Sequence, residues 1–362
     1  MKRAISILIL LLTILVALSG CRRPLEYYYG LGAKVVVKVI WKAEVYPDGV
    51  KPTGVTIYYF RNGEFYTKQT TANVDSCTVD LIPGRYKFYM ITQSPEEYGR
   101  MEFDNLTDYD NASVSVEETE TKWYVRSEGE EIITNPEMMS VGISDEFEVT
   151  TEMVENYQHY KHLLNSSTKV AGEGDVSEAE KQMNIFTIRV PVHPTSIVSQ
   201  FWVTIYSDNA DVLQSLRAST SGMAKTFELT KNTTGKEIAT QFITHWSLSI
   251  DNPEKRVGHV DGIITTLGFP NGEIPSSQRD STLNVSALLI DNETVEEYVF
   301  NVGDKIALEK PQTGFRALYR LIFGSVNSPA IHPEDVKPLD GRNGFDASVE
   351  DWDIGEIVEV PM

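Results

Sequence analysis

The chain has little cysteine and few basic residues for its length. It contains 2 Cys in 362 residues, too few for the disulfide framework of a small secreted domain. Its 32 Lys and Arg stand against 52 Asp and Glu, which gives a formal net charge of −20. Nucleic acid is therefore excluded as a partner, because binding a phosphate backbone requires clustered basic side chains. At this length, a hydrophobic content of 41% suffices for two domains with their own cores.

Motifs for catalysis and metal binding are also lacking. No Gly-x-Ser-x-Gly nucleophile turn or phosphate-binding glycine loop occurs, so we expect no catalytic residue, no enzyme activity and no cofactor. His159 and His162 have a spacing that suits zinc on a helix, but no neighbouring Cys, Asp or Glu completes a ligand set. The acidic stretch 104–111, from Asp104 to Asn111, lacks the Gly and Glu of an EF-hand. A polar loop is favoured there, and Ca²⁺ binding stays open.

The longest apolar run lies at the start of the chain. Met1-Lys2-Arg3 precede an apolar stretch from Ala4 to Ala17, which is shorter than the roughly 20 residues of a membrane-spanning helix. This order is typical of an export signal, so we expect residues 1–20 to be removed. Leu18-Ser19-Gly20-Cys21 resembles the lipobox of bacterial lipoproteins. The resemblance implies that acyl chains such as palmitate on Cys21 attach the protein to a membrane, with 21–33 as a tether. The alternative is a soluble secretory signal with an incidental cysteine.

The remainder of the chain has the two-residue period of β-strands. We expect an N-terminal β-sandwich over 34–165, a polar linker over 166–183 and a C-terminal β-sandwich over 184–362. Asn62-Gly63 predicts a hairpin turn, and Cys77 lies in an alternating strand where a buried thiol is favoured. A short helix is predicted from Thr151 to Leu164 and another over 210–218. The segment 314–323 suits a helix or a strand equally well.

Four short motifs resemble the fimbrillin-type lipoproteins of Bacteroidales. They are the lipobox with the early strand 34–41, Leu81-Ile82-Pro83-Gly84-Arg85-Tyr86, Ser219-Thr220-Ser221-Gly222-Met223-Ala224, and the 344–352 pattern of Gly-Phe-Asp, Val and Trp. The resemblance implies a mainly β fold of two tandem Greek-key, transthyretin-like sandwiches with one or two short helices. It also implies a non-enzymatic subunit of a surface pilus, or fimbria, on the outer membrane.

In such pili, one subunit donates a β-strand to an open sheet of its neighbour. The resemblance makes Ile357, Val358 and Val360 a possible donor strand, which could instead complete its own sandwich. It makes Val35, Val37 and Val39 the strand whose removal would open an acceptor groove. No convincing site for proteolytic maturation follows Cys21, which favours a retained lipid anchor or accessory subunit over a shaft subunit. The face of the outer membrane stays open.

An outer-membrane glycan-binding lipoprotein is the alternative function. Its support is the aromatic content, and exposed rings at Trp123-Tyr124 or Trp246 would carry it. Tyr27-Tyr28-Tyr29, just after the predicted lipid, could dock a partner or lie at the membrane interface.

Overall fold

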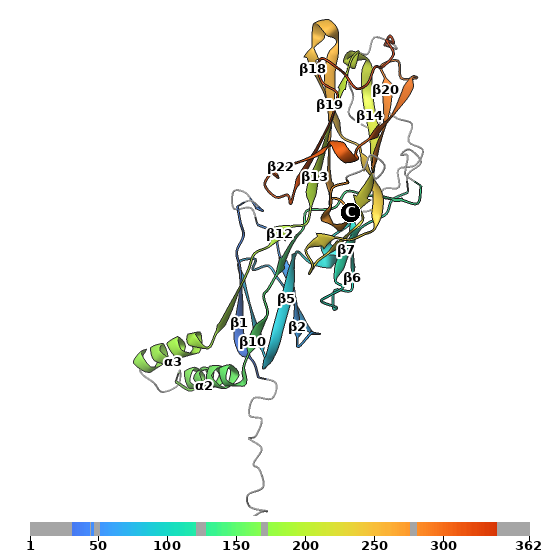
Figure 1. The fold of residues 1–362 in the computed structure, drawn as a ribbon. Helices are drawn as coiled ribbons and strands as arrows, with labels where there is room; N and C mark the ends of the chain where they lie inside the picture. The colour runs from blue at the N-terminus through green and yellow to red at the C-terminus, as the bar shows by residue number, and fades with distance from the viewer. Residues whose placement is uncertain are drawn as a thin grey trace, which may run out of the picture. The chain divides into compact units, whose positions relative to one another are not determined.

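The computed structural model describes residues 31–43, 45–46, 51–120, 128–167, 173–275 and 281–338. Within these ranges the protein is mainly β, with two α-helices and five β-sheets (Figure 1). The prediction of a mainly β fold built from sandwiches is confirmed.

Three of the sheets consist wholly or largely of strands from the first half of the chain or contain two of them. The three-stranded sheet has the order β11 (Ile188–Val192), β1 (Ala33–Val39), β4 (Ser76–Leu81). The six-stranded sheet has the order β12 (Thr195–Ser196), β9 (Ser140–Ile143), β5 (Gly84–Thr92), β2 (Val55–Arg61), β3 (Glu64–Thr71), with β10 (Phe147–Val149) also paired to β5. The four-stranded sheet has the order β16 (Thr233–Thr234), β15 (Thr226–Glu228), β7 (Ser113–Val116), β6 (Met101–Asp104).

The other two sheets form a sandwich from strands of the second half of the chain, joined by β8 from the first half. One has the order β21 (Val295–Asn301), β20 (Thr282–Leu289), β14 (Leu213–Ala224), β17 (Ile238–Ile243), β8 (Glu131–Ile133). The other has the order β18 (Trp246–Asn252), β19 (Val257–Thr266), β13 (Ser199–Ser207), β23 (Leu318–Phe323), β22 (Ile306–Glu309). Their inward residues, such as Phe201 of β13 and Val285 of β20, share one buried core, so the two sheets face each other.

A second core lies between the six-stranded and four-stranded sheets. Tyr58 and Tyr89 stack at 5.0 Å on neighbouring strands β2 and β5, and both belong to the same cluster as Val114 and Phe227.

The β2–β3 turn has the conformation that its sequence predicted. Asn62 and Gly63 have φ values of 53° and 91°, which a two-residue hairpin turn requires.

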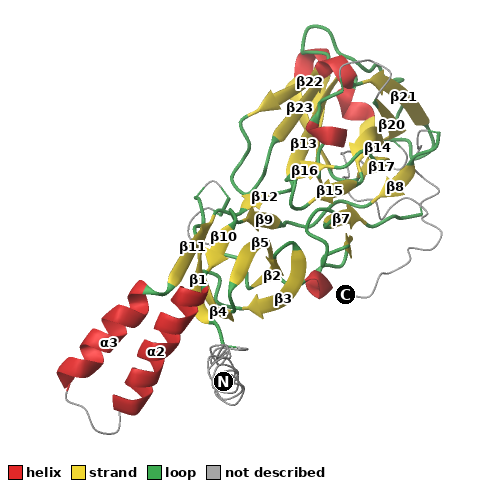
Figure 2. Cartoon of the chain, turned by 60° about the horizontal axis from the view of Figure 1, so that its bottom comes forward, coloured by secondary structure: helices red, strands yellow, loops and turns green. Residues whose placement is uncertain are grey.

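The two helices form a hairpin (Figure 2). α2 (Thr151–Ser167) covers the helix predicted for 151–164. α3 (Glu173–Ile185) lies beside it and occupies most of the segment 166–183, which was expected to be a linker. The hydroxyl of Thr150 accepts a hydrogen bond from the Met153 backbone N–H at 3.2 Å, which caps the first turn of α2.

The helix predicted for 210–218 is wrong. A single 3-10 turn, η3 (Ala210–Val212), precedes β14, and a register shift between Leu213 and Ser215 interrupts that strand. The irregularity places Leu213 and Leu216, three residues apart, in the same core. A β-bulge therefore produced the apolar spacing that looked helical. In the ambiguous segment 314–323, the structure has the strand β23.

The compact units of the structure divide differently from the predicted domains. Unit 1 consists of the described residues in the ranges 31–36, 78–85 and 148–189. Unit 2 consists of the described residues in the ranges 37–77, 86–147 and 190–338. Strands from both halves of the chain share sheets in unit 2. β7 and β8 pair with β15 and β17, although the helices separate them in sequence.

Candidate functional site

β1, which contains Val35, Val37 and Val39, is a central strand of its sheet. The exposed fractions of these side chains are 0%, 0% and 5%, and that of Ala33 is 0%. At the end of the strand, the Val39 N–H donates to the Asp75 carbonyl and the next N–H donates to the Val192 carbonyl, both at 2.9 Å. β1 is therefore fully integrated in its sheet, with the side chains of its valines directed into the protein.

Helix α2 holds the start of β1 within unit 1. The Gln158 side chain donates a hydrogen bond from Nε2 to the Gly32 carbonyl at 2.6 Å. Val154 and Tyr157 of the same helix are buried. Burial, together with the negative charge of Asp80, raises the pKa of Tyr157. Lys161 Nζ lies 3.5 Å from Asp80 Oδ2 on β4, so α2 contacts both the entry to β1 and the neighbouring strand.

Gly32 allows the chain to enter β1 against the backbone of β4. A Cβ atom at this position would lie 2.7 Å from the Leu81 nitrogen, which is closer than any side chain tolerates. This position therefore requires glycine for a close approach of two backbones. Neither Gly32 nor Gln158 was predicted as functional, because no local pattern marks a contact between residues 126 positions apart.

The last described segment is fastened to β13 in unit 2. The Ala330 N–H donates to the Tyr206 carbonyl at 2.8 Å, and the Asp208 N–H donates to the Ile331 carbonyl at 3.2 Å. Ile331 pairs with Ser207 as an isolated parallel bridge, and its side chain is fully buried in the sandwich core. Ala330 and Val336 also pack against this core, so the segment is held by apolar contacts around Ile331.

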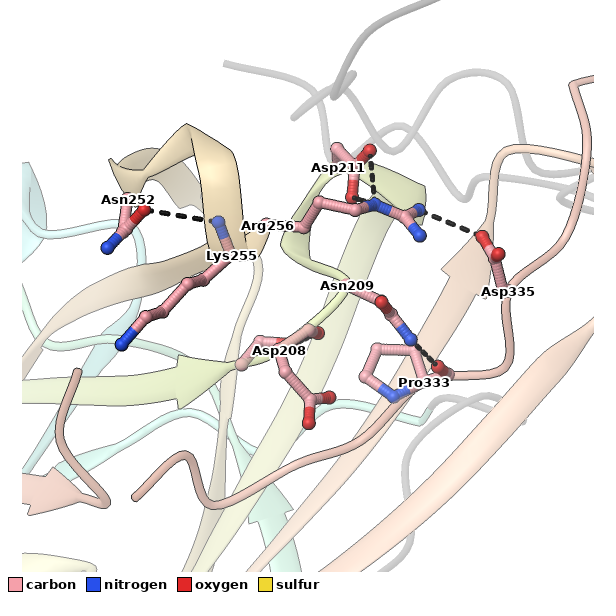
Figure 3. A network of polar contacts seen from close by, with 9 residues as sticks. Asp208, Asn209, Asp211, Asn252, Lys255, Arg256, Pro333 and Asp335 are labelled. Atoms are coloured by element: carbon pink, nitrogen blue, oxygen red, sulfur yellow. Dashed lines mark hydrogen bonds and ion pairs between the residues drawn. The ribbon is translucent and has the colours of Figure 1, made fainter. Parts of the chain in front are cut away.

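Polar contacts hold the residues that follow Ile331 (Figure 3). Arg256 donates from Nε to both carboxylate oxygens of Asp211, at 2.8 and 2.9 Å, and from Nη2 to Asp335 Oδ1 at 2.9 Å. These hydrogen bonds, those to Asp335 first, raise the pKa of the Arg256 guanidinium. Asn209 Nδ2 donates to the Pro333 carbonyl at 3.0 Å. We call Arg256, Asp211 and Asp335 the Arg256 latch.

The sequence did not predict the Arg256 latch, because its three residues lie in loops that are far apart in the chain. The sequence signal nearest to it is the turn-forming Asn252-Pro253 pair, which begins the 3-10 turn η4 (Pro253–Lys255). Arg256 follows with φ of 55°, and its carbonyl accepts a hydrogen bond from the Ala210 N–H at 2.9 Å. The turn indicates a loop, and only the fold brings Asp211 and Asp335 to it.

Several predicted site residues lie outside the described residues. They are Cys21, Tyr27-Tyr28-Tyr29, Trp123-Tyr124 and the possible donor strand with Ile357, Val358 and Val360. Their roles stay predictions.

Trp246 is buried, so it does not supply the exposed ring that would support the glycan-binding alternative. It is buried in the sandwich core, and its Nε1 donates to the Ile243 carbonyl at 3.1 Å. It lies opposite Gly262, where the missing side chain leaves room for the indole ring.

Cys77 is buried in β4 beside Tyr59, as predicted, and burial raises the pKa of the thiol to about 11.

The polar stretch 104–111 forms a loop with internal hydrogen bonds. Asp108 accepts from the Asp110 backbone N–H at 3.2 Å and from the Asn111 side chain at 2.8 Å. Among the described residues, no group of three or more His, Cys, Asp or Glu side chains could hold a metal ion, and His159 and His162 belong to no such group.

A family model matches residues 20–244, which is more than half of the chain. The chain belongs to the DUF5119 family. The family's description is a domain of unknown function, so membership in DUF5119 assigns no activity. A comparison with curated proteins found no match.

Structures similar to this DUF5119 chain are fimbrial and adhesin-like proteins of Bacteroidales, the group that its motifs resemble. A candidate adhesin from Bacteroides ovatus aligns with a TM-score of 0.51 and 12% identity, covering 88% of this chain and 99% of that one. The fimbrial anchor protein Mfa2 from Porphyromonas gingivalis aligns with a TM-score of 0.44 and 12% identity, covering 80% and 90%. The first similarity shows a shared fold.

In the described part of the chain, no helix has both the length and the apolar character needed to cross a membrane.

Proposed function

We propose that this chain is a non-enzymatic fimbrial anchor or accessory subunit of the cell envelope. In this proposal, lipid on Cys21 attaches it to the outer membrane, and it contacts other fimbrial subunits through β-strand addition. The names of its structural neighbours, an adhesin candidate and a fimbrial anchor, support a fimbrial or adhesin-like role at the cell surface.

The observation that carries the proposal is the way β1 is held. A subunit that accepts a donor strand needs an open groove, whereas here three buried valines fill that position. The Gln158 hydrogen bond and the close approach at Gly32 fasten the beginning of the same strand. A chain that keeps its first strand is suited to the end of a polymer, where it remains attached to its membrane anchor. The groove at Val35, Val37 and Val39 therefore stays occupied, and contact with a neighbour falls to the C-terminal residues.

The alternation of apolar and acidic residues near the end of the chain allows a sharp test. Val358 and Val360 would share one face of an extended strand, and Glu359 would lie on the other. We expect the double variant Val358→Asp/Val360→Asp to lose co-purification with fimbrial subunits from outer-membrane extracts. Glu359→Gln serves as the matched control and should retain it. Unchanged co-purification of the double variant would refute strand donation.

Lipid attachment is tested separately. Cys21→Ser should abolish incorporation of a palmitate analogue and release the protein from the membrane fraction. Because this variant leaves the C-terminal residues intact, solubilised Cys21→Ser protein should still bind its partner. Continued lipid labelling of Cys21→Ser would place the acyl group elsewhere.

A further inference from the structure

One side of the sheet β18-β19-β13-β23-β22 faces away from the sandwich core. Along β13, Phe201, Val203 and Ile205 enter the core, so the alternate residues Trp202, Thr204 and Tyr206 lie on the opposite side. The strand registers place neighbours beside each of them. Trp202 lies between Ile263 and Arg320, Thr204 between Asp261 and Ile322, and Tyr206 opposite His259. We call these eight residues, with Asp251, the β13 outer face.

The polar side chains of the β13 outer face hold one another in place. Asp261 Oδ1 accepts hydrogen bonds from Trp202 Nε1, at 3.2 Å, and from the Thr204 hydroxyl. His259 lies between two carboxylates, with Nδ1 at 2.7 Å from Asp251 Oδ2 and Nε2 at 3.5 Å from Asp261 Oδ2. A ligand would therefore meet ordered groups and lose little conformational entropy in fixing them.

Hydrogen-bonding capacity remains on both sides of this network. The Arg320 guanidinium lies 4.2 Å from the centre of the Trp202 ring. Among the described residues, neither that guanidinium nor the Tyr206 hydroxyl has a hydrogen-bond partner, and the Tyr206 ring contacts the His259 ring. Arg320 thus offers donors and Asp251 and Asp261 offer acceptors, on opposite sides of a half-exposed indole ring.

Apolar surface accompanies these polar groups. Ile263 and Ile322 have exposed fractions of 41% and 48%, unusually large for aliphatic residues in the middle of a sheet. Trp202 and Tyr206 lie on one face four residues apart, about 13 Å along an extended strand, which leaves room for more than one sugar ring.

We propose that the β13 outer face binds a neutral oligosaccharide. A sugar combines apolar C–H faces with hydroxyl groups that both donate and accept hydrogen bonds, which matches rings and aliphatic side chains interspersed with fixed carboxylate and guanidinium groups. A polyanionic ligand does not fit, because Asp251 and Asp261 flank the site and the chain carries a net charge of −20. An extended peptide would pair with a sheet edge rather than with this face. The site does not depend on strand donation, so either proposal can fail alone.

The test is a titration of the full-length protein in detergent with oligosaccharides, in which calorimetry and tryptophan fluorescence measure binding. The probes are neutral hexasaccharides of glucose, mannose and xylose, with a hyaluronan oligosaccharide as the charged comparison. We expect at least one neutral hexasaccharide to bind with a Kd of about 1 mM or tighter. Trp202→Ala and Tyr206→Ala should each weaken that binding about tenfold or more.

Two further variants keep the test interpretable if Trp202→Ala unfolds the sheet. Trp202→Phe retains an apolar ring but removes the hydrogen bond to Asp261, and Arg320→Gln removes the charge above the ring. Each should weaken binding without loss of the native circular dichroism spectrum. Phe65→Ala, an exposed aromatic residue on β3, is the control and should bind as the parent does. Absence of binding to every neutral probe, preference for hyaluronan, or binding unaffected by the Trp202 and Tyr206 variants would each overturn the proposal.

Discussion

The first described strand and the last described segment are fastened in opposite ways. β1 lies between two other strands and buries Ala33, Val35, Val37 and Val39. The segment 330–335 buries Ile331 and Pro333, packs Ala330 against the sandwich core, and is also held by polar contacts that include the Arg256 latch. The ion pair between Arg256 and Asp335 is open to solvent, since these side chains have exposed fractions of 34% and 67%.

This difference indicates which end of the described chain can be rearranged. Removing β1 would expose four buried apolar side chains and a set of backbone hydrogen-bonding groups, each with a large cost in free energy. Detaching the residues after Ile331 would expose the buried Pro333 and the half-buried Val336, and would break surface ion pairs that contribute little. The physics therefore favours a permanent first strand and a releasable C-terminal segment, which is the asymmetry that the proposed function requires.

The largest effect is expected from a charge in β1. Val37→Asp places a carboxylate where the native side chain is fully buried, so it should lower the free energy of unfolding by about 3 kcal/mol or more. Urea unfolding monitored by circular dichroism measures this change. Lys38→Asp, at the exposed neighbouring position, is the control and should have a much smaller effect. Equal losses for the two variants would mean that β1 is not the integral strand described above.

Ile331→Ala should follow, with a loss of about 2 to 4 kcal/mol from a cavity in the core. The amide hydrogens of residues 330–335 should exchange with solvent faster, while those of β1 keep their rates. Lys337→Ala, beyond the buried residue, serves as control. Exchange in Ile331→Ala that accelerates as much in β1 as in residues 330–335 would remove the proposed difference between the two ends.

Gln158→Ala tests the contact of α2 with the entry to β1. The loss of one hydrogen bond to the Gly32 carbonyl should cost about 1 kcal/mol. Hydrogen exchange should accelerate at the beginning of β1 more than at its end. Gln182→Ala should leave β1 unchanged, because among the described residues the Gln182 side chain on α3 bonds only to Glu178. Unaltered exchange in Gln158→Ala would show that the valines alone hold the strand.

The smallest effect on stability is expected at the Arg256 latch. Arg256→Gln should change the free energy of unfolding by about 0 to 1 kcal/mol, because its ion pairs are exposed and screened by salt. Limited proteolysis after residue 335 should nevertheless become faster, and high salt should produce the same change in the parent protein. Lys255→Gln is the matched control at the adjacent position. A loss of several kcal/mol would show that the C-terminal segment is as firmly fixed as β1.

Cys77 offers a probe of β4, the strand beside β1. Burial raises the pKa of its thiol to about 11, so iodoacetamide should alkylate it slowly at pH 8 in the folded protein and rapidly after unfolding. Because the folded-state pKa lies above the unfolded value, the protonated thiol favours the folded state below the unfolded pKa, and this contribution is lost as pH rises toward 11. Val37→Asp should speed alkylation, whereas Arg256→Gln should not. Rapid alkylation of the folded parent would contradict the burial of Cys77.

Local patterns predicted much of the fold. Asn62-Gly63 specified its turn because both residues tolerate positive φ, and the alternating valines of β1 marked a half-buried strand. The segment 210–218 was misread, since a bulge put Leu213 and Leu216 on one face with helical spacing. The exposure of Trp246 stayed open, because an aromatic residue in a strand has the same sequence signature whether its side of the sheet faces the core or solvent.

The amino-acid sequence alone predicted that nucleic acid is not a partner, that lipid attaches to Cys21 and that the chain is mainly β, since each prediction depends on composition or on neighbouring residues. The bond from Gln158 to Gly32, the joining of Asp211 to Asp335 by Arg256, and the position of Trp202 beside Arg320 became visible in the tertiary structure. These contacts join residues far apart in the chain. Their geometry depends on strand order and register, which a pattern of neighbouring residues does not encode.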